Sequence, residues 1–324
     1  MKMSLGNIYN KIVCISPYLE VLVRRFYWNN VETFAKFKPK FSNSQTTISV
    51  FCEFERILEA LENLGVKKGS LLIVHSSYDA LERTGLSPDE IIDALLELIG
   101  CDGTLAMPVI RRYKEQPKKG KEYITCNMDT IKCTYNVQRS RVVTGFLPYY
   151  MMLRKNCVIS RHPLNPMAAI GPLAELMMKN NIEGEKPSPH GSNSSWKFCL
   201  DNKAIVIGLG VDLGHYLTIT HVAEEAYSDW PIMDWYRERK FTIVDHDYTR
   251  DIVVRERKPK WGTMFFAERN LKKRLLKKGI LRVCTVGNID VSAVDSQEYI
   301  SYLRSINDKG FPYIVPKKYL KKDV

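Results

Sequence analysis

The sequence has few of the features that mark a metal site, a disulfide framework or a membrane protein. Its eight cysteines include no CxxC pair, and Cys126 and Cys133 have no partners at zinc-site spacing. We therefore expect no metal, and reduced cysteines that are mostly small buried apolar residues. No run of 18 apolar residues occurs, so no membrane span is expected. The first apolar stretches are interrupted by polar residues, namely Asn7, Asn10, Lys11 and Glu20. This pattern argues against a signal peptide and predicts a cytoplasmic protein.

Two common enzyme signatures are also missing. Gly208 and Gly210 follow an apolar run, but Gly214 comes one residue too late for a dinucleotide-binding fingerprint. Ser76 and Ser77 do not lie in the G-x-S-x-G turn that carries the nucleophile of many hydrolases. The sequence therefore gives little support to an NAD-dependent enzyme or a serine hydrolase.

The net charge of +12 is concentrated near the C-terminus. Residues 237–324 contain 21 Lys and Arg against 11 Asp and Glu, whereas the preceding 236 residues contain 27 against 25. Residues 269–283 predict an amphipathic helix with a lysine-rich face over Leu271, Leu275, Leu276 and Ile280. That face is either simply solvated or contacts an anionic partner, such as a cofactor phosphate, a membrane surface or a nucleic acid. Because the rest of the chain is nearly neutral, we expect no nucleic-acid partner.

The order of expected elements predicts an α/β fold. Residues 1–47 are expected to form a partly helical extension, with a helix over 18–26 and a polar linker over 42–47. Residues 48–324 are expected to form one domain in which helices and strands alternate, as in sheets with parallel pairs. Helices are expected over 51–64 and 87–100, strands over 70–75, 103–108 and 204–209, and a β-hairpin over 241–257.

The segment after the 204–209 strand contains the strongest chemical pattern. His221 and Glu224 are three residues apart, so they would share one face of a helix that starts near a strand end. Ligand sites of open α/β folds lie at such strand ends. A carboxylate and an imidazole together can remove a proton from an amine or a hydroxyl. Spacing alone leaves a surface helical pair as an equal alternative.

Two further segments have candidate ligand groups. His75, Ser76 and Ser77 end the 70–75 strand, where they either cap the strand or cradle a phosphate or an amide-rich cofactor arm. His162 precedes Pro163, which holds the histidine in extended backbone. A structural role for His162 is the more common alternative.

Taken together, five segments resemble the aminoglycoside 3-N-acetyltransferase family. They are LGVKKGSLLIVHSSYDAL from residue 64, IIDALLELIGCDGTLAMP from 91, SRHPLNPMAAIGPLAE from 160, GSNSSWK from 191 and AIVIGLGVDLGHYLTITHVAEEAY from 204. They cover roughly residues 50–290, in order and with fitting spacing.

The resemblance implies a fold, a co-substrate and a reaction. The fold would be a single α/β/α-type domain, with helices on both faces of a mixed sheet. The reaction would transfer an acetyl group from acetyl-CoA to an amine of an aminoglycoside or related amino sugar. The His-x-x-Glu segment of the family maps onto His221 and Glu224. The resemblance also implies a cofactor-binding set near the strand ends: His75, Ser76, Ser77, Tyr78 and Pro108.

Departures from the family pattern bear on the substrate and on the histidine. A family aspartate becomes Asn136, which weakens the prediction of a polycationic drug as acceptor. The histidine before the family's glycine loop maps near Asn181, with His190 as its possible replacement. We predict that Glu224 is the base or orients a histidine base, preferably His190, with His162 and His221 in support.

The predicted acceptor is an amino sugar of polysaccharide or secondary metabolism, such as a nucleotide-linked one, with little activity on aminoglycosides. Two alternatives of another class stay open: a non-catalytic relative that binds CoA or a sugar, and an anion-binding interaction protein. A homodimer is possible.

Overall fold

The computed structural model describes residues 13–36, 51–117 and 120–321. Seven strands of this part form a mixed sheet in the order β4-β5-β2-β1-β6-β10-β9. Strand β1 pairs in parallel with β2 and β6, and the other pairings in this sheet are antiparallel. The strand bounds are β1 Leu71–Ser76, β2 Thr104–Pro108, β4 Val158–Ile159, β5 Met167–Ile170, β6 Ile205–Leu209, β9 Arg282–Val286 and β10 Ile289–Asp295.

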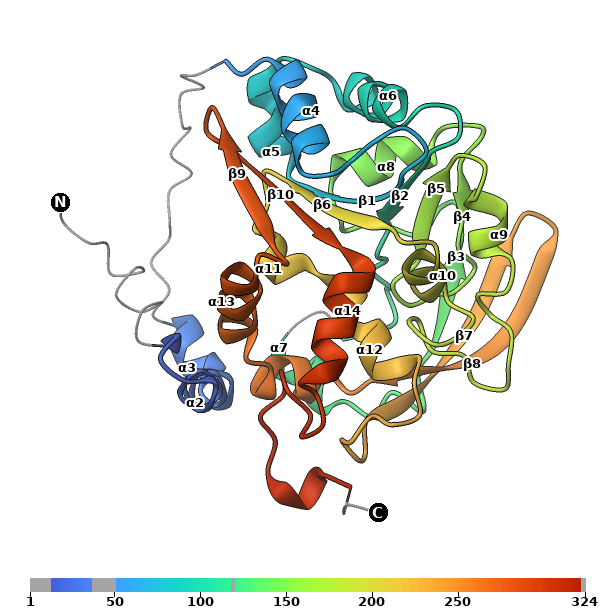
Figure 1. The fold of residues 1–324 in the computed structure, drawn as a ribbon. Helices are drawn as coiled ribbons and strands as arrows, with labels where there is room; N and C mark the ends of the chain where they lie inside the picture. The colour runs from blue at the N-terminus through green and yellow to red at the C-terminus, as the bar shows by residue number, and fades with distance from the viewer. Residues whose placement is uncertain (1–12, 37–50, 118–119, 322–324) are drawn as a thin grey trace.

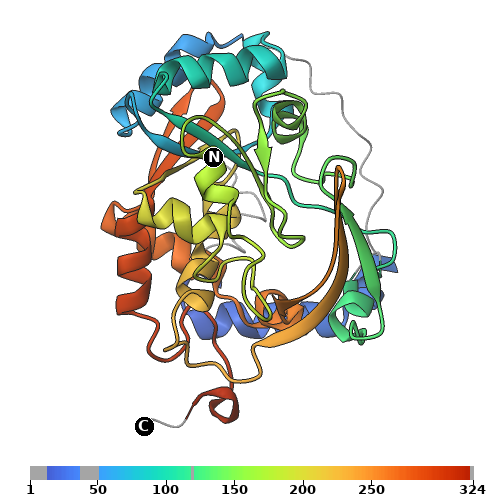
Figure 2. The ribbon, with the colours of Figure 1, turned by 90° about the vertical axis from the view of Figure 1, so that its right-hand side faces the viewer.

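A second sheet of three strands has the order β3-β7-β8. The hairpin of β7 (Tyr236–Asp245) and β8 (Tyr248–Arg257) confirms the expected one, and β3 (Lys132–Asn136) adds in parallel to β7. In Figure 2 the hairpin curves away from the main sheet. It therefore supplies a separate wall beside the carboxyl ends of the main strands.

Helices cover both faces of the main sheet, as Figure 1 shows, which confirms the predicted fold class. Alternate residues of β1 divide between the two cores: Leu72 and Val74 pack with α4 and α6, and Leu71 and Ile73 pack with α10 and α14. The helices are α2 Pro17–Asn29, α3 Val31–Lys36, α4 Phe54–Asn63, α5 Tyr78–Leu81, α6 Pro88–Ile99, α7 Gly120–Thr125, α8 Phe146–Met152, α9 Ala174–Met178, α10 Ser195–Asp201, α11 Leu213–Tyr216, α12 Val222–Glu225, α13 Glu268–Lys278 and α14 Ser296–Ser305.

Local sequence signals explain several element boundaries. Ser87 caps α6 with Glu90 in a capping box, with Pro88 in the first turn, as the sequence predicts. Gly171 has φ +129°, and a Cβ there would lie 2.4 Å from the carbonyl oxygen of Gly103. Only glycine fits at this close approach of two backbones. In α13, Leu271 and Leu275 are buried as expected, but Leu276 is exposed because it lies outside the stripe that faces the core.

The expected N-terminal helix is present as α2, which packs against the body of the protein. The carboxylate of buried Glu20 accepts hydrogen bonds from the backbone N–H groups of Arg269 (2.8 Å) and Asn270 (3.0 Å). Glu20 therefore caps the N-terminus of α13, where negative charge is favourable. The Arg24 side chain forms an ion pair of 3.1 Å with Glu268. The expected linker over 42–47 and the expected domain start lie outside the described residues.

None of the helices in the described ranges is long and apolar enough to cross a lipid bilayer.

Candidate active site

The predicted pair of His221 and Glu224 is formed. After β6, the chain continues through α11 and a 3-10 turn that ends at His221, and α12 begins at Val222. Nδ1 of His221 lies 2.9 Å from Oε2 of Glu224. Glu224 is only 1% exposed, so the alternative of a surface helical pair is wrong.

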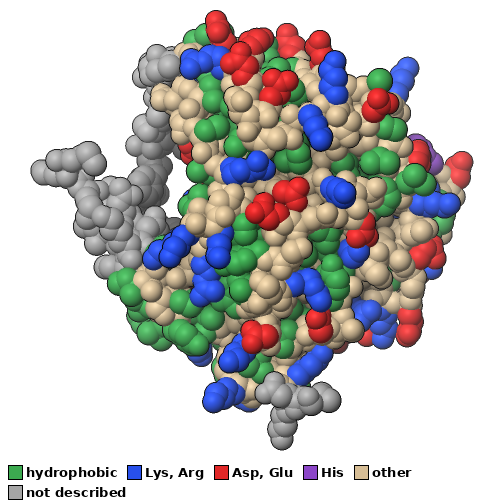
Figure 3. Space-filling view, viewed as in Figure 1, with side chains coloured by type: hydrophobic (Ala, Val, Ile, Leu, Met, Phe, Trp, Pro, Cys, Tyr) green, Lys and Arg blue, Asp and Glu red, His purple; other side chains and the backbone are tan. Residues whose placement is uncertain are grey.

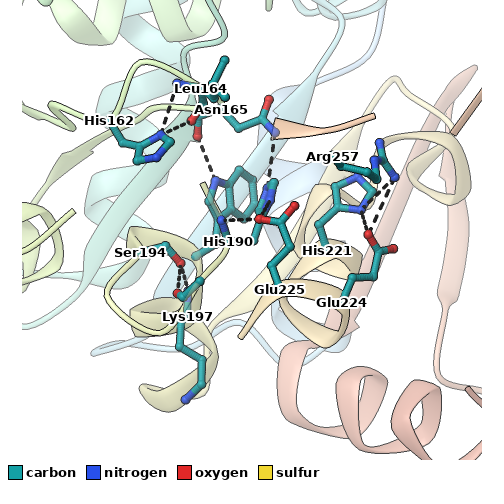
Figure 4. A network of polar contacts seen from close by, with 12 residues as sticks. His162, Leu164, Asn165, His190, Ser194, Lys197, His221, Glu224, Glu225 and Arg257 are labelled. Carbon is teal, nitrogen blue, oxygen red and sulfur yellow. Dashed lines mark hydrogen bonds and ion pairs between the residues drawn. The ribbon is translucent and has the colours of Figure 1, made fainter. Parts of the chain in front are cut away.

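Three groups converge on the Glu224 carboxylate, of which Figure 4 shows His221 and Arg257. The Tyr313 hydroxyl donates to Oε1 at 2.8 Å, and Nη1 of Arg257 lies 3.7 Å from Oε2, beside the His221 contact. Burial raises the pKa of Glu224 to about 7, although Arg257 and the Tyr313 hydrogen bond oppose this change. Burial, reinforced by the positive charge of Arg257, holds the pKa of His221 well below its usual value. His221 is therefore neutral at physiological pH.

A second histidine–carboxylate pair lies beside the first. The backbone N–H of His190 donates to Oε2 of Glu225 at 3.1 Å, and Nδ1 of the ring lies 3.4 Å from the same oxygen. Burial would raise the pKa of Glu225, but the interactions of its carboxylate with His190, His221 and Arg257 outweigh burial, so this pKa is lowered. The rings of His190 and His221 are 5.0 Å apart.

The pairing of His190 with Glu224 that the sequence favoured is wrong. The side chains of successive helical residues point in directions about 100° apart, so the carboxylates of Glu224 and Glu225 contact different histidines. In the structure, Glu224 contacts His221 and Glu225 contacts His190.

Both histidines open on a cavity of about 690 Å³. His190, His221 and Glu225 line it, whereas Glu224 is not among its lining residues and lies behind His221. The opposite walls come from α2, through Arg24 and Trp28, and from the end of the β7–β8 hairpin. Nδ1 of His221 is engaged by Glu224, so Nε2 is the ring nitrogen left for a ligand in the cavity.

The carboxylates that line the cavity all have cationic or histidine partners. Glu256 binds Arg237 at 2.6 Å and Arg239 at 3.0 Å. Glu268 binds Arg24 at 3.1 Å and His215 at 3.0 Å. Glu225 is paired with His190, as described above. The cavity therefore does not offer an unpaired carboxylate among its described lining residues. Arg112 adds positive charge to the lining, whereas Arg257 is paired with Glu224.

His162 lies away from this cavity. It is 3% exposed, and its two ring nitrogens lie 2.9 Å and 3.4 Å from the carbonyl oxygens of Leu164 and Pro187. Burial lowers the pKa of His162 to about 4. These contacts link the ring to the loops that carry Asn165 and His190. The supporting role of His162 in catalysis stays a prediction.

The predicted cofactor-binding residues also lie outside the lining of this cavity. His75 as a residue is partly exposed, but its Nε2 is buried and has no hydrogen-bond partner among the described residues. Desolvation lowers the pKa of His75 to about 4. The Tyr78 hydroxyl donates to the carbonyl of Leu86 at 3.1 Å, so it is engaged within the chain. The Pro108 carbonyl accepts from the Thr144 hydroxyl at 2.7 Å. Ser76 and Ser77 are partly exposed at the end of β1, near Gly145.

The sequence analysis missed several residues of the site. Glu225 could have been found as the neighbour of Glu224 on a short helix. Tyr313 comes from a loop 89 residues beyond its partner Glu224, and no local pattern predicts that contact. Arg257 lies in the hairpin that the sequence predicts, but the direction of its side chain depends on how the hairpin packs.

The structure is thus that of an α/β protein with a mixed sheet and two neighbouring histidine–carboxylate pairs beside a large cavity. The family model of aminoglycoside 3-N-acetyltransferase matches residues 73–306. The chain belongs to this family.

Curated relatives and solved structures agree with this assignment. Aminoglycoside N(3)-acetyltransferase IX of Micromonospora chalcea is 28% identical over 180 residues, which are 52% of this chain and 60% of the relative. Aminoglycoside N(3)-acetyltransferase VIII of Streptomyces fradiae is 27% identical over 174 residues, 52% of this chain and 59% of the relative. The chain thus spans about three fifths of the curated relatives that it matches.

Two solved structures show that the fold is shared. The apoenzyme of aminoglycoside acetyltransferase AAC(3)-IVa aligns with TM-score 0.61 at 22% identity, covering 85% of this chain and 95% of its own. The structure described as AAC-IIIb binary with CoASH aligns with TM-score 0.65 at 18% identity, covering 82% of this chain and 99% of its own.

Proposed function

We propose that the protein is an N-acetyltransferase that moves an acetyl group from acetyl-CoA to the amine of an amino sugar. Membership of the family supports the reaction class. The observation that carries the proposal is the buried His221–Glu224 pair, which leaves one histidine nitrogen facing a cavity of about 690 Å³. That cavity has the size of a small-molecule site.

In the proposed mechanism, His221 is the general base and Glu224 orients it. The amine nitrogen attacks the thioester carbonyl carbon while its proton passes to Nε2 of His221. The tetrahedral intermediate collapses with cleavage of the carbon–sulfur bond, and the proton on His221 goes to the CoA sulfur. The products are the N-acetylated sugar and CoA with a free thiol. This assignment exchanges the predicted roles of His190 and His221, because Glu224 contacts His221.

The neighbouring residues have separate proposed roles. Glu225 and His190 form the adjacent wall, where the buried pair fixes the loop before Gly191. Acetyl-CoA is proposed to bind at the carboxyl ends of β1 and β2, near Ser76, Ser77 and Pro108. The proximity of Ser76 and Gly145 supports this, because a glycine lets a narrow thioester arm approach the backbone.

The acceptor is proposed to be an amino sugar with an anionic group. Aminoglycosides are polycations, and their binding is favoured by carboxylates that have no other partner. Here Glu225, Glu256 and Glu268 are already paired, while Arg112 lines the same cavity and Arg257 has as its ionic partner Glu224, which lies outside the lining. An acceptor with a phosphate or carboxylate group matches these charges better than a gentamicin-like compound.

Release of free CoA tests the proposal. The purified protein is incubated with acetyl-CoA and one of three amines: a nucleoside-diphosphate amino sugar, a neutral amino sugar or a gentamicin-like aminoglycoside. We expect the highest kcat/KM with the anionic amino sugar. A higher value on the aminoglycoside would overturn the acceptor proposal and leave the reaction class intact. No CoA release with any amine, and no acetyl-CoA binding by calorimetry, would favour a non-catalytic interaction protein.

A further inference from the structure

Helix α2 presents two opposite faces. On one, Glu20 and Val21 are 1% and 4% exposed. On the other, Tyr18, Leu22 and Phe26 are 72%, 63% and 62% exposed. Together with Ile15, which precedes the helix and is 73% exposed, we call these four residues the apolar face. Tyr18, Leu22 and Phe26 follow at intervals of four, so they form one continuous stripe along the helix.

The apolar face is held outward by the contacts of the inner face. Glu20 accepts hydrogen bonds from Arg269 and Asn270, and the Arg24 guanidinium contacts both Glu268 and the carbonyl oxygen of Thr263. These contacts fix the rotation of α2 about its axis. The exposure of Leu22 and Phe26 is therefore a property of the packed helix.

Basic side chains border the apolar face. Nζ of Lys273 donates to the carbonyl of Cys14 at 3.1 Å, which places α13 directly beside the start of α2. Lys277 and Lys278 are exposed in the last turn of α13. The single acidic residue of α2, Glu20, is buried. Figure 3 shows hydrophobic side chains gathered over α2, with Lys and Arg side chains next to them.

We propose that this surface docks the protein on an anionic lipid bilayer. An exposed stripe of Leu and aromatic residues beside lysines is the arrangement by which helices lie in the membrane interface. The apolar face would enter the boundary between headgroups and acyl chains, and Lys273, Lys277 and Lys278 would contact anionic headgroups. At 13 residues, α2 is too short to span a bilayer.

The same charges disfavour a second copy of the chain as the partner. A two-fold interface would place two copies of this positively charged surface against each other. Such like charges repel, whereas an anionic membrane attracts them. The charges therefore favour a lipid surface.

Docking through the apolar face has a consequence for the cavity. Arg24 and Trp28, on the opposite side of α2, line it. A membrane bound to the outer face would thus lie one helix diameter, about 10 Å, from the cavity wall.

Vesicle sedimentation with the full-length protein tests this proposal without depending on catalysis. We expect binding to vesicles that contain phosphatidylglycerol and much weaker binding to phosphatidylcholine alone. The double substitution Leu22→Ser with Phe26→Ser should weaken binding at least about tenfold. Each charge removed by Lys277→Gln or Lys278→Gln should weaken it about fivefold.

The matched control replaces two equally exposed leucines elsewhere. Leu153 and Leu176 are 64% and 58% exposed, and Leu153→Ser with Leu176→Ser should leave vesicle binding unchanged. Thermal melting checks that each variant is folded. The proposal is overturned if the wild type does not bind anionic vesicles, or if the Leu22 and Phe26 variant binds them as well as the wild type. A third outcome is that the wild type binds no vesicles but forms a dimer, and that the Leu22 and Phe26 variant is monomeric. This result would assign the apolar face to a second copy of the chain.

Discussion

Replacement of Glu224 by glutamine is the sharpest test of the proposed chemistry. The amide has the size of the carboxylate, so Oε1 can still accept the hydrogen bond from Tyr313. The NH₂ group would then face His221 and donate to Nδ1. A neutral imidazole whose Nδ1 accepts a hydrogen bond has its proton on Nε2. The nitrogen that faces the cavity would therefore be unable to accept a proton from the amine.

The expected loss in kcat is large. General-base help from a positioned side chain contributes about 10²- to 10⁴-fold, and an amide that imposes the wrong tautomer removes most of it. The KM for the acceptor should change little, because Glu224 does not line the cavity. A fall in kcat of about 10²- to 10⁴-fold, with KM within about threefold, is the predicted signature.

The assay is steady-state release of CoA, with circular dichroism and thermal melting as folding controls. Tyr313→Phe is the matched variant, because it removes the hydrogen bond to Oε1 and leaves both the carboxylate and His221 in place. It also removes the hydrogen bond that the Tyr313 hydroxyl accepts from Arg257. It should lose less than about tenfold in kcat, since the lost hydrogen bonds only support the pair of Glu224 and His221. Full turnover by a folded Glu224→Gln enzyme would refute the role of Glu224.

Three further predictions follow from burial and backbone geometry. Because burial raises the pKa of Glu224 to about 7, kcat should fall as the pH drops through about 7, and Tyr313→Phe should move this midpoint upward, as followed by pH–rate profiles. Desolvation lowers the pKa of His75 and of His162 from 6.5 to about 4. The free energy of unfolding should therefore decrease as the pH falls from 6.5 to 4, by about 3 kcal/mol for each group in urea unfolding; a His75→Phe protein that loses stability with acid as steeply as the wild type would contradict this. Gly171→Ala should destabilise the fold by about 2 kcal/mol more than Gly184→Ala, because a Cβ at Gly184 would meet no atom within 4 Å, and equal melting temperatures would disprove the steric argument.

Local patterns in the sequence were enough to predict the framework of the fold. The apolar runs of β1, β2 and β6 and the capping box of α6 are signals within a few residues, and each element was found where expected. The hairpin could be predicted because apolar and polar residues alternate along residues 241–257. Its first strand is longer than expected, since β7 begins at Tyr236. The parallel addition of β3 to β7 could not be predicted, because it joins segments about 100 residues apart.

The site was only partly predictable for a related reason. The contact of His221 with Glu224 depends on helical spacing, which the sequence shows directly. The partner of His190 depends on how a long loop packs against α12, and that packing is not visible in local spacing. The same holds for Arg24 and Trp28, whose place in the cavity wall depends on the docking of α2.

The cap that Glu20 places on α13 also bears on how the protein folds. Its carboxylate and the N–H of Asn270 are 250 residues apart in the chain. Closing so long a loop is entropically costly, so contacts of this kind form late, after the local helices and the central strands. The wall of the cavity that contains Arg24 is then completed only when the two ends of the chain meet. During refolding, acetyl transfer should return more slowly than the helical circular dichroism signal.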